Sequence, residues 1–142
     1  MDEGEFLRDA LTRLGLWTEP FVPGYERLIG GVASDIWRVD LPAGPVCIKR
    51  ALPKLRVATD WRAPVARNAF EVAWMQTARA IEPDSAPRIV AHDAEAGLFV
   101  MPYLPPDRYR LWKLELRDGR VEVSFASEVG RRLGHILSLI HI

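Results

Sequence analysis

The first residues of the chain have the hydrophobic spacing of a helix. Apolar positions recur three and four residues apart over residues 3–14, which is typical of an amphipathic helix. Asp2 and Glu5 stand where a capping box would satisfy the free N–H groups at its start, and Gly15 suits its end. Prolines and a glycine then predict a turn over residues 20–24, which stops the helix.

From residue 25 the spacing changes to that of strands. Three runs of β-favouring residues follow, and a loop with two adjacent glycines joins the first two. Because side chains alternate along a strand, the third run places Cys47, Lys49 and Ala51 on one face. The expected strands are residues 25–29, 35–41 and 46–51.

A helical stripe returns after an irregular connector over residues 52–63. Pro64 suits the first turn of a helix, because its missing N–H is not needed there. Apolar and small positions then continue at helical spacing, which predicts a helix over residues 64–81. The positions that form this stripe are Phe70, Ala73, Trp74, Thr77, Ala78 and Ile81.

The rest of the chain predicts a second hairpin and two more helices. The hairpin strands are residues 88–92 and 98–101, and Pro102 ends the sheet because proline cannot donate to a ladder. Helical spacing returns over residues 109–117 and 124–136. This order predicts an α+β fold, a five-stranded antiparallel sheet with a packed helix between its third and fourth strands.

Composition and charge restrict the class of protein. Hydrophobic residues make up 49% of the 142 residues and charged residues 27%, which is a folding composition. The 19 basic and 19 acidic residues cancel, which argues against a nucleic-acid partner. No apolar run approaches the ~18–20 residues that span a membrane, and the acidic start does not fit a signal peptide. The single Cys47 excludes an internal disulfide and is consistent with a reducing compartment. Together, these features lead us to expect a soluble, cytoplasmic protein.

The charge is nevertheless uneven along the chain. Residues 45–80 carry seven basic and two acidic groups. This block could hold an anionic ligand or simply form a solvated surface. Only three of the 19 basic residues are lysines, and Lys49 is the one inside an apolar strand.

Together these features resemble the small lobe of the protein-kinase-like fold, in particular the aminoglycoside phosphotransferase/choline-kinase-like family of small-molecule kinases. The resemblance covers residues 25–104 and continues more loosely to residue 136. The loop departs from the spaced G-x-G-x-x-G form, because its two glycines are adjacent. The matching segments are Gly30-Gly31-Val32-Ala33-Ser34, Val46-Cys47-Ile48-Lys49, Glu71 and Leu98-Phe99-Val100-Met101-Pro102-Tyr103-Leu104.

The resemblance implies that ATP is the cofactor, used together with Mg²⁺. Backbone N–H groups of residues 30–34 would approach the phosphates, since glycine has no Cβ to prevent it. Lys49 would contact the α- and β-phosphates. Glu71, 22 residues further on, would hold the lysine through an ion pair.

The resemblance also implies where the base would lie. Cys47 would touch adenine, and Met101 would lie at the back of its pocket. The Pro102 carbonyl and the Leu104 N–H would hydrogen-bond the base. The implied cofactor-binding residues are Gly30, Gly31, Val32, Ala33, Ser34, Ile36, Cys47, Lys49, Glu71, Met101, Pro102 and Leu104.

Each of these residues also has an ordinary structural interpretation. Two glycines suit a hairpin turn, and Lys49 could extend to water. Glu71 could pair with Arg67 one turn earlier. Cys47 and Met101 could simply fill the core. It is their combination, in this order, that favours a nucleotide site.

The catalytic residues of such a kinase are not in the sequence. The pattern H-x-D-x-x-x-x-N does not occur, since the only asparagine, Asn68, precedes all three histidines. No aspartate follows Asp118. We therefore expect the general base and the Mg²⁺ ligands in a large lobe that this chain lacks, and we expect the chain alone to be inactive.

These expectations divide the chain into four parts. They are an N-terminal helix and linker (1–24), a kinase-like small lobe (25–107), the helical start of a truncated large lobe (108–136) and a tail (137–142). The tail resembles one translation frame of a sequencing-library adapter, so we expect it to be non-native.

Three functions follow from the sequence. The first is the ATP-binding lobe of a phosphotransferase that transfers the γ-phosphate to a hydroxyl of a small substrate. The alternative is a complete, non-catalytic module that binds a nucleotide or a protein. A nucleic-acid binder that uses the basic segment 49–67 is the third and least favoured.

Overall fold

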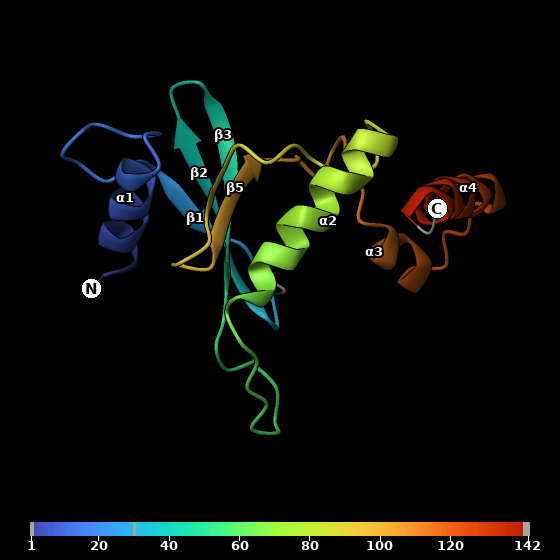
Figure 1. Cartoon of the computed structure of the whole chain (residues 1–142), viewed down its shortest axis with the longest axis horizontal. Coiled ribbons are helices and arrows are strands. Elements are labelled where there is room, and N and C mark those ends of the chain that lie inside the picture. The colour runs from blue at the N-terminus through green and yellow to red at the C-terminus, as the bar shows by residue number, and fades with distance from the viewer. Residues whose placement is uncertain (1, 30, 141–142) are drawn as a thin grey trace.

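A five-stranded antiparallel sheet runs through the centre of the molecule, between two helices (Figure 1). The computed structural model describes residues 2–29 and 31–140. The elements are α1 (Glu3–Arg13), β1 (Tyr25–Arg27), β2 (Ser34–Leu41), β3 (Gly44–Ala51), α2 (Arg67–Ile81), β4 (Ala91–Asp93), β5 (Leu98–Pro102), α3 (Trp112–Arg117) and α4 (Val123–Ile140). The sheet order is β1-β2-β3-β5-β4, and every neighbouring pair is antiparallel. The predicted α+β class and five-stranded antiparallel sheet are confirmed.

The face of the sheet toward α1 carries the larger hydrophobic core. The predicted capping box is present, because the Asp2 carboxylate accepts the Glu5 N–H and the Asp2 N–H donates to the Glu5 carboxylate. Leu7 and Leu11 of α1 are fully buried. They belong to one cluster with alternate residues of three strands, namely Trp37, Val39, Val46, Ile48 and Val100.

The opposite face of the sheet packs against α2. Val72 and Met75 of this helix form a second cluster with Phe99 of β5. α2 begins at Arg67 and not at Pro64, because residues 64–66 form a turn with hydrogen bonds three residues apart. Among the positions of the stripe expected from helical spacing, Ala78 is buried, Ile81 is half-buried and the others are exposed. Asn68, Val72, Met75 and Ala78 are buried, whereas Phe70 is 77% exposed and Trp74 is exposed as well.

The second hairpin is shorter on its first strand than predicted. β4 begins at Ala91, although Val90 still donates to the Val100 carbonyl at 2.7 Å. This bond does not follow the register of the ladder, in which Val90 would lie opposite Met101, so the regular pairing begins only at Ala91. Gly97 takes the positive φ of +62° that the turn requires.

The last two helices bury little of their surface. α3 begins three residues later than predicted, and α4 extends past residue 136 to Ile140. Ile136 is the one buried residue of α4 among those described. His135 and Arg131 of α4 contact the Glu82 carboxylate at the end of α2. No helix within residues 2–29 and 31–140 is long and apolar enough to cross a membrane.

Candidate functional site

Lys49 lies at the middle of β3, on the face of the sheet that packs against α2. Its register partners are Ile36 of β2 and Phe99 of β5. The Nζ of Lys49 forms an ion pair with the Glu71 carboxylate of α2, and it lies 5.9 Å from the centroid of the Phe99 ring. The Lys49 side chain is 23% exposed and that of Glu71 is 39% exposed. The predicted ion pair is therefore present on the α2 face, and both of its side chains reach solvent.

The alternative partner of Glu71 is occupied elsewhere. Arg67 donates its guanidinium N–H groups to four backbone carbonyls and does not contact Glu71. Since Glu71 pairs with Lys49, the lysine does not simply extend into water. The geometry fixes the ammonium group at one place beside the sheet.

Cys47 and Met101 are direct register neighbours on the same face. Met101 packs against the cluster that α2 forms with Phe99, so it also fills the core. Cys47 is buried, and this burial raises the pKa of its thiol to about 11, against a smaller opposing effect of the Lys49 charge. The thiol is therefore neutral at ordinary pH and presents an apolar surface beside Lys49.

The raised pKa of Cys47 predicts a loss of stability at high pH. The unfolded thiol loses its proton near pH 9 while the folded thiol keeps it to about pH 11. The unfolded state then binds fewer protons, so the free energy of unfolding falls across this window, by up to about 2–3 kcal/mol. Urea unfolding of the chain and of Cys47→Ala measures it. The variant should lose less stability between pH 9 and pH 11, and equal slopes would contradict the prediction.

Arg38 shares this face of the sheet, although no motif in the sequence singled it out. It is the register partner of Cys47 on β2. Its guanidinium lies 5.2 Å from the centroid of the Tyr103 ring, and Nη2 is 2.9 Å from Asp40. Arg38 thus lies against the segment that follows β5.

That segment is the one predicted to hydrogen-bond a base. Pro102 is the last residue of β5, and the Tyr103 N–H donates to the Pro45 carbonyl at 3.1 Å. Leu104 is exposed. Within residues 2–29 and 31–140 no acceptor is found for the Leu104 N–H, which leaves this donor available to a ligand.

The glycine loop, residues 30–34, is attached to the rest of the described chain through carbonyl groups of its described residues. The Gly31 carbonyl accepts from the Arg56 side chain, and the Val32 carbonyl accepts from the Arg56 N–H at 2.9 Å. The Ala33 carbonyl accepts from the Leu52 N–H and from Arg67. In the described part of the chain, the N–H groups of residues 31–33 have no acceptor.

The loop also leaves no room for a side chain at Gly31. A Cβ there would lie 2.1 Å from the Ser34 carbonyl oxygen and 3.6 Å from Ile36. Ser34 is buried as the first residue of β2, and Val32 is exposed. Gly30, which the sequence also assigned to the site, lies outside the described residues.

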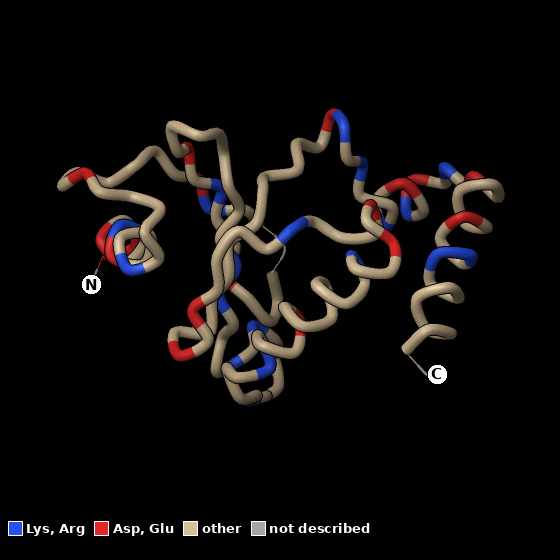
Figure 2. The backbone as a smooth tube through the Cα atoms, turned by 45° about the horizontal axis from the view of Figure 1, so that its top comes forward, with Lys and Arg blue, Asp and Glu red and all other residues tan. Residues whose placement is uncertain are grey.

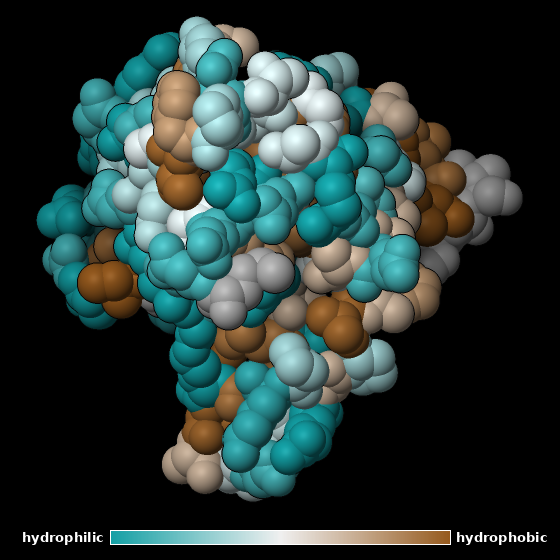
Figure 3. All heavy atoms as spheres, turned by 90° about the vertical axis from the view of Figure 1, so that its left-hand side faces the viewer, coloured by the Kyte–Doolittle hydropathy of each residue, from teal (hydrophilic) through white to brown (hydrophobic). Residues whose placement is uncertain are grey.

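The basic residues of segment 45–80 lie in several different environments. Figure 2 shows basic residues along the connector between β3 and α2, and Figure 3 shows this connector as a protrusion with apolar side chains among polar ones. Arg50 and Arg56 turn to the buried Asp35 carboxylate, which Arg27 also contacts. Lys54 pairs with the exposed Asp60 at 3.0 Å. Most of the block is therefore neither a single anion site nor a free basic surface.

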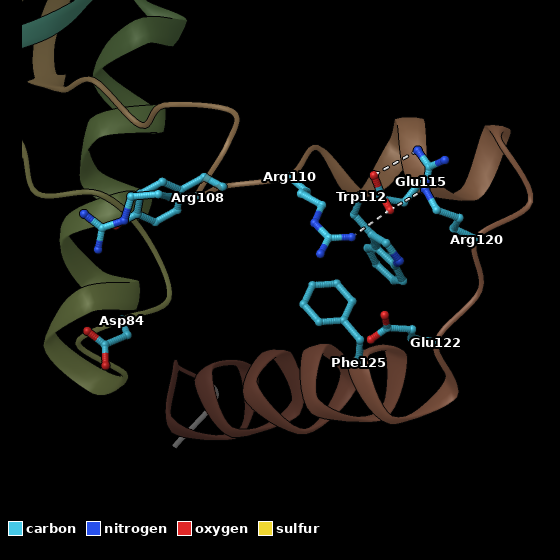
Figure 4. A pocket seen from close by; sticks show the side chains of 9 residues that line it. Asp84, Arg108, Arg110, Trp112, Glu115, Arg120, Glu122 and Phe125 are labelled. Atoms are coloured by element: carbon cyan, nitrogen blue, oxygen red, sulfur yellow. Dashed lines mark hydrogen bonds and ion pairs between the residues drawn. The ribbon is translucent and has the colours of Figure 1, made fainter.

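A separate cavity of about 520 Å³ lies between the segment after β5 and the last two helices (Figure 4). Trp112 and Phe125 meet there edge to face, 5.3 Å apart, and Arg120 donates twice to Glu115. None of the residues predicted to bind a cofactor lines this cavity. It is therefore distinct from the Lys49 site.

A kinase site also needs side chains that bind Mg²⁺. Among residues 2–29 and 31–140, no three His, Cys, Asp or Glu side chains gather as a metal site would require. The described residues therefore do not fit a Mg²⁺ site.

Comparison with known proteins gives a partial similarity. The chain is 36% identical over 84 residues to methylthioribose kinase 2 of Oryza sativa subsp. japonica. The match covers 58% of this chain and 20% of the kinase, so the chain spans about a fifth of the length of this relative. No family model matches the chain. Over part of its length, the chain is therefore similar to a small-molecule kinase.

Proposed function

We propose that the chain binds ATP on the α2 face of its sheet, as the nucleotide-binding lobe of a small-molecule kinase. The observation that carries the proposal is the Lys49–Glu71 ion pair beside a loop whose N–H groups have no acceptor in the described part of the chain. A fixed ammonium group and free backbone N–H groups are what a polyphosphate needs. The partial similarity to methylthioribose kinase supports the same assignment.

Each part of the site would hold a different part of ATP. Lys49 and the N–H groups of residues 31–33 would hold the phosphates, and the collision of a Cβ at Gly31 explains why glycine is needed there. Cys47 and its register neighbour Met101 supply an apolar surface suited to a purine. The free Leu104 N–H and the Pro102 carbonyl would hydrogen-bond its edge.

ATP supplies the γ-phosphoryl group that a kinase transfers to a hydroxyl. The residues that would activate this hydroxyl and hold Mg²⁺ are not in this sequence. We therefore propose nucleotide binding, without transfer, for these 142 residues. Methylthioribose is the first acceptor to test in any longer form, because the relative is named for it.

Titration of the ¹⁵N-labelled chain with ATP tests the proposal by NMR. We expect the largest shift changes at the amides of residues 31–34, Cys47, Lys49 and Leu104. Residues of the α1 face, such as Val39, serve as the internal control, because they point to the other side of the sheet. The absence of binding, or changes confined to the α1 face, would overturn the proposal.

Replacing Gly31 by alanine is expected to weaken ATP binding about tenfold or more, because the new Cβ must displace the Ser34 carbonyl and with it the loop. Gly130→Ala is the matched control, since nothing lies within 4 Å of a Cβ there. The ATP dissociation constants of the two variants measure the effect. Unchanged affinity in Gly31→Ala would remove the loop from the site.

The alternative is a complete, non-catalytic binding module. α3, α4 and the residues beside them expose many apolar side chains, a surface that either a further lobe or a protein partner would cover, so it fits both functions. The source DNA separates the two functions. An H-x-D-x-x-x-x-N motif encoded downstream would favour the kinase, and its absence would favour the module. The exposed residues include Leu111, Leu116, Val121, Val123, Leu133 and Leu139.

A further inference from the structure

Arg67 joins three segments of backbone at the edge of the candidate site. Its Nη1 donates to the carbonyls of Ala63 and Pro64 at 3.1 and 2.9 Å. Its Nη2 donates to the carbonyls of Ala33 and Leu52 at 2.6 and 2.8 Å. One side chain thus connects the glycine loop, the end of β3 and the connector that leads into α2.

The positive charge of Arg67 does not stabilise α2, the helix whose first residue it is. It is the first residue of α2, where the helix dipole disfavours positive charge, and the first turn has no acidic residue and no side-chain cap. Arg67 forms no ion pair with a carboxylate of the described residues. Its guanidinium is therefore held by carbonyl oxygens alone, and its charge is not neutralised locally.

The contact with Ala33 sets the orientation of the loop. The Ala33 carbonyl accepts from both Arg67 and the Leu52 N–H, the latter at 3.0 Å. Glu71 lies one turn after Arg67 on the same helix. The helix that holds the Lys49 ammonium group therefore also holds the loop, through this one side chain.

We propose that Arg67 is a positioning residue for the triphosphate, which fixes the loop backbone relative to α2 so that the loop N–H groups and Lys49 face one ligand. The inference rests on the proposed function, since it assigns the loop to phosphate. Arg67 touches carbonyls and not the nucleotide. Its uncompensated charge adds to the positive potential at the loop.

Arg67→Met and Arg67→Lys test the inference in the full chain. The matched control is Arg79→Met, because Arg79 also lies on α2 and donates to a carbonyl, that of Ala86 at 2.7 Å, away from the loop. The first measurement is of the dissociation constants for ATP and for adenosine. The second is of the hydrogen-exchange protection of the Leu52 amide, which donates to the same Ala33 carbonyl as Arg67.

Arg67→Met is expected to weaken ATP binding about tenfold and adenosine binding by less than about twofold, because only the phosphates contact the loop. Protection of the Leu52 amide should fall. Arg67→Lys should lie between Arg67→Met and the unaltered chain, since an ammonium group cannot bond all four carbonyls. The control should change neither the ratio of the two affinities nor the Leu52 exchange.

Two outcomes would overturn the inference. Equal losses for ATP and adenosine would mean that Arg67 only stabilises the fold, and unchanged Leu52 exchange would mean that it does not hold the loop. Failure of the unaltered chain to bind ATP would instead overturn the proposed function. In that case the Leu52 exchange still decides whether Arg67 fixes the loop.

Discussion

Lys49→Met is expected to lower the affinity of the chain for ATP by about 10- to 100-fold while the fold stays intact. A hydrogen bond between an ammonium group and a charged oxygen contributes about 1.5–3 kcal/mol, and methionine keeps the length of the side chain but not this interaction. The ATP titration used for the unaltered chain measures the loss.

The fold should tolerate this change because Glu71 does not become a buried, unpaired charge. Its side chain is 39% exposed and can be hydrated once the lysine is gone. Ion pairs that reach solvent contribute about 0–1 kcal/mol, so urea unfolding should change by no more than that. A large loss of stability would show that the pair serves the fold rather than a ligand.

The sequence offers matched controls for this experiment. Lys54→Met removes a lysine that pairs with the exposed Asp60 and not with Glu71, and it should leave ATP affinity unchanged. Glu71→Gln keeps Lys49 but not its ionic partner and should weaken binding less than Lys49→Met. Equal effects of the Lys49 and Lys54 substitutions would mean that the ATP affinity reflects only net charge.

The sequence predicted the pairing of Lys49 but not the helix face that provides its partner. The resemblance to the kinase small lobe implied the ion pair, and Glu71 is the only acidic residue between Trp61 and Ile81. α2, however, has apolar residues on more than one side, and helical spacing alone chose the side of Phe70 and Trp74. Contact with Phe99 of β5 selects Val72 and Met75 instead, and no local pattern contains that information.

The contacts of the glycine loop were also beyond prediction from the sequence. Arg56 and Arg67 belong to a basic block that could have been solvated or bound to an anion. In the structure both donate to backbone carbonyls of the loop, and Arg56 also pairs with the buried Asp35. Hydrogen bonds that join residues more than 20 positions apart depend on the path of the connector, which has no periodic pattern.

The largest loss of stability is expected for a substitution at Phe99, on the face of the sheet that packs against α2. Phe99 is fully buried, between Lys49 on the sheet and the Val72–Met75 side of α2. Phe99→Ala removes the ring and leaves a cavity, which costs about 3–5 kcal/mol. Because a domain of this size is stable by only about 5–15 kcal/mol, urea unfolding should shift strongly.

Phe70→Ala provides the test on the other side of the same helix. Phe70 is 77% exposed, and alanine has the higher helix propensity, so this variant should be within about 0.5 kcal/mol of the unaltered chain. If Phe70→Ala were the more destabilising of the two, the stripe predicted from helical spacing would face the sheet after all. Glu71 would then lie on a different side of α2 relative to Lys49, and the proposed phosphate-binding arrangement would lose its basis.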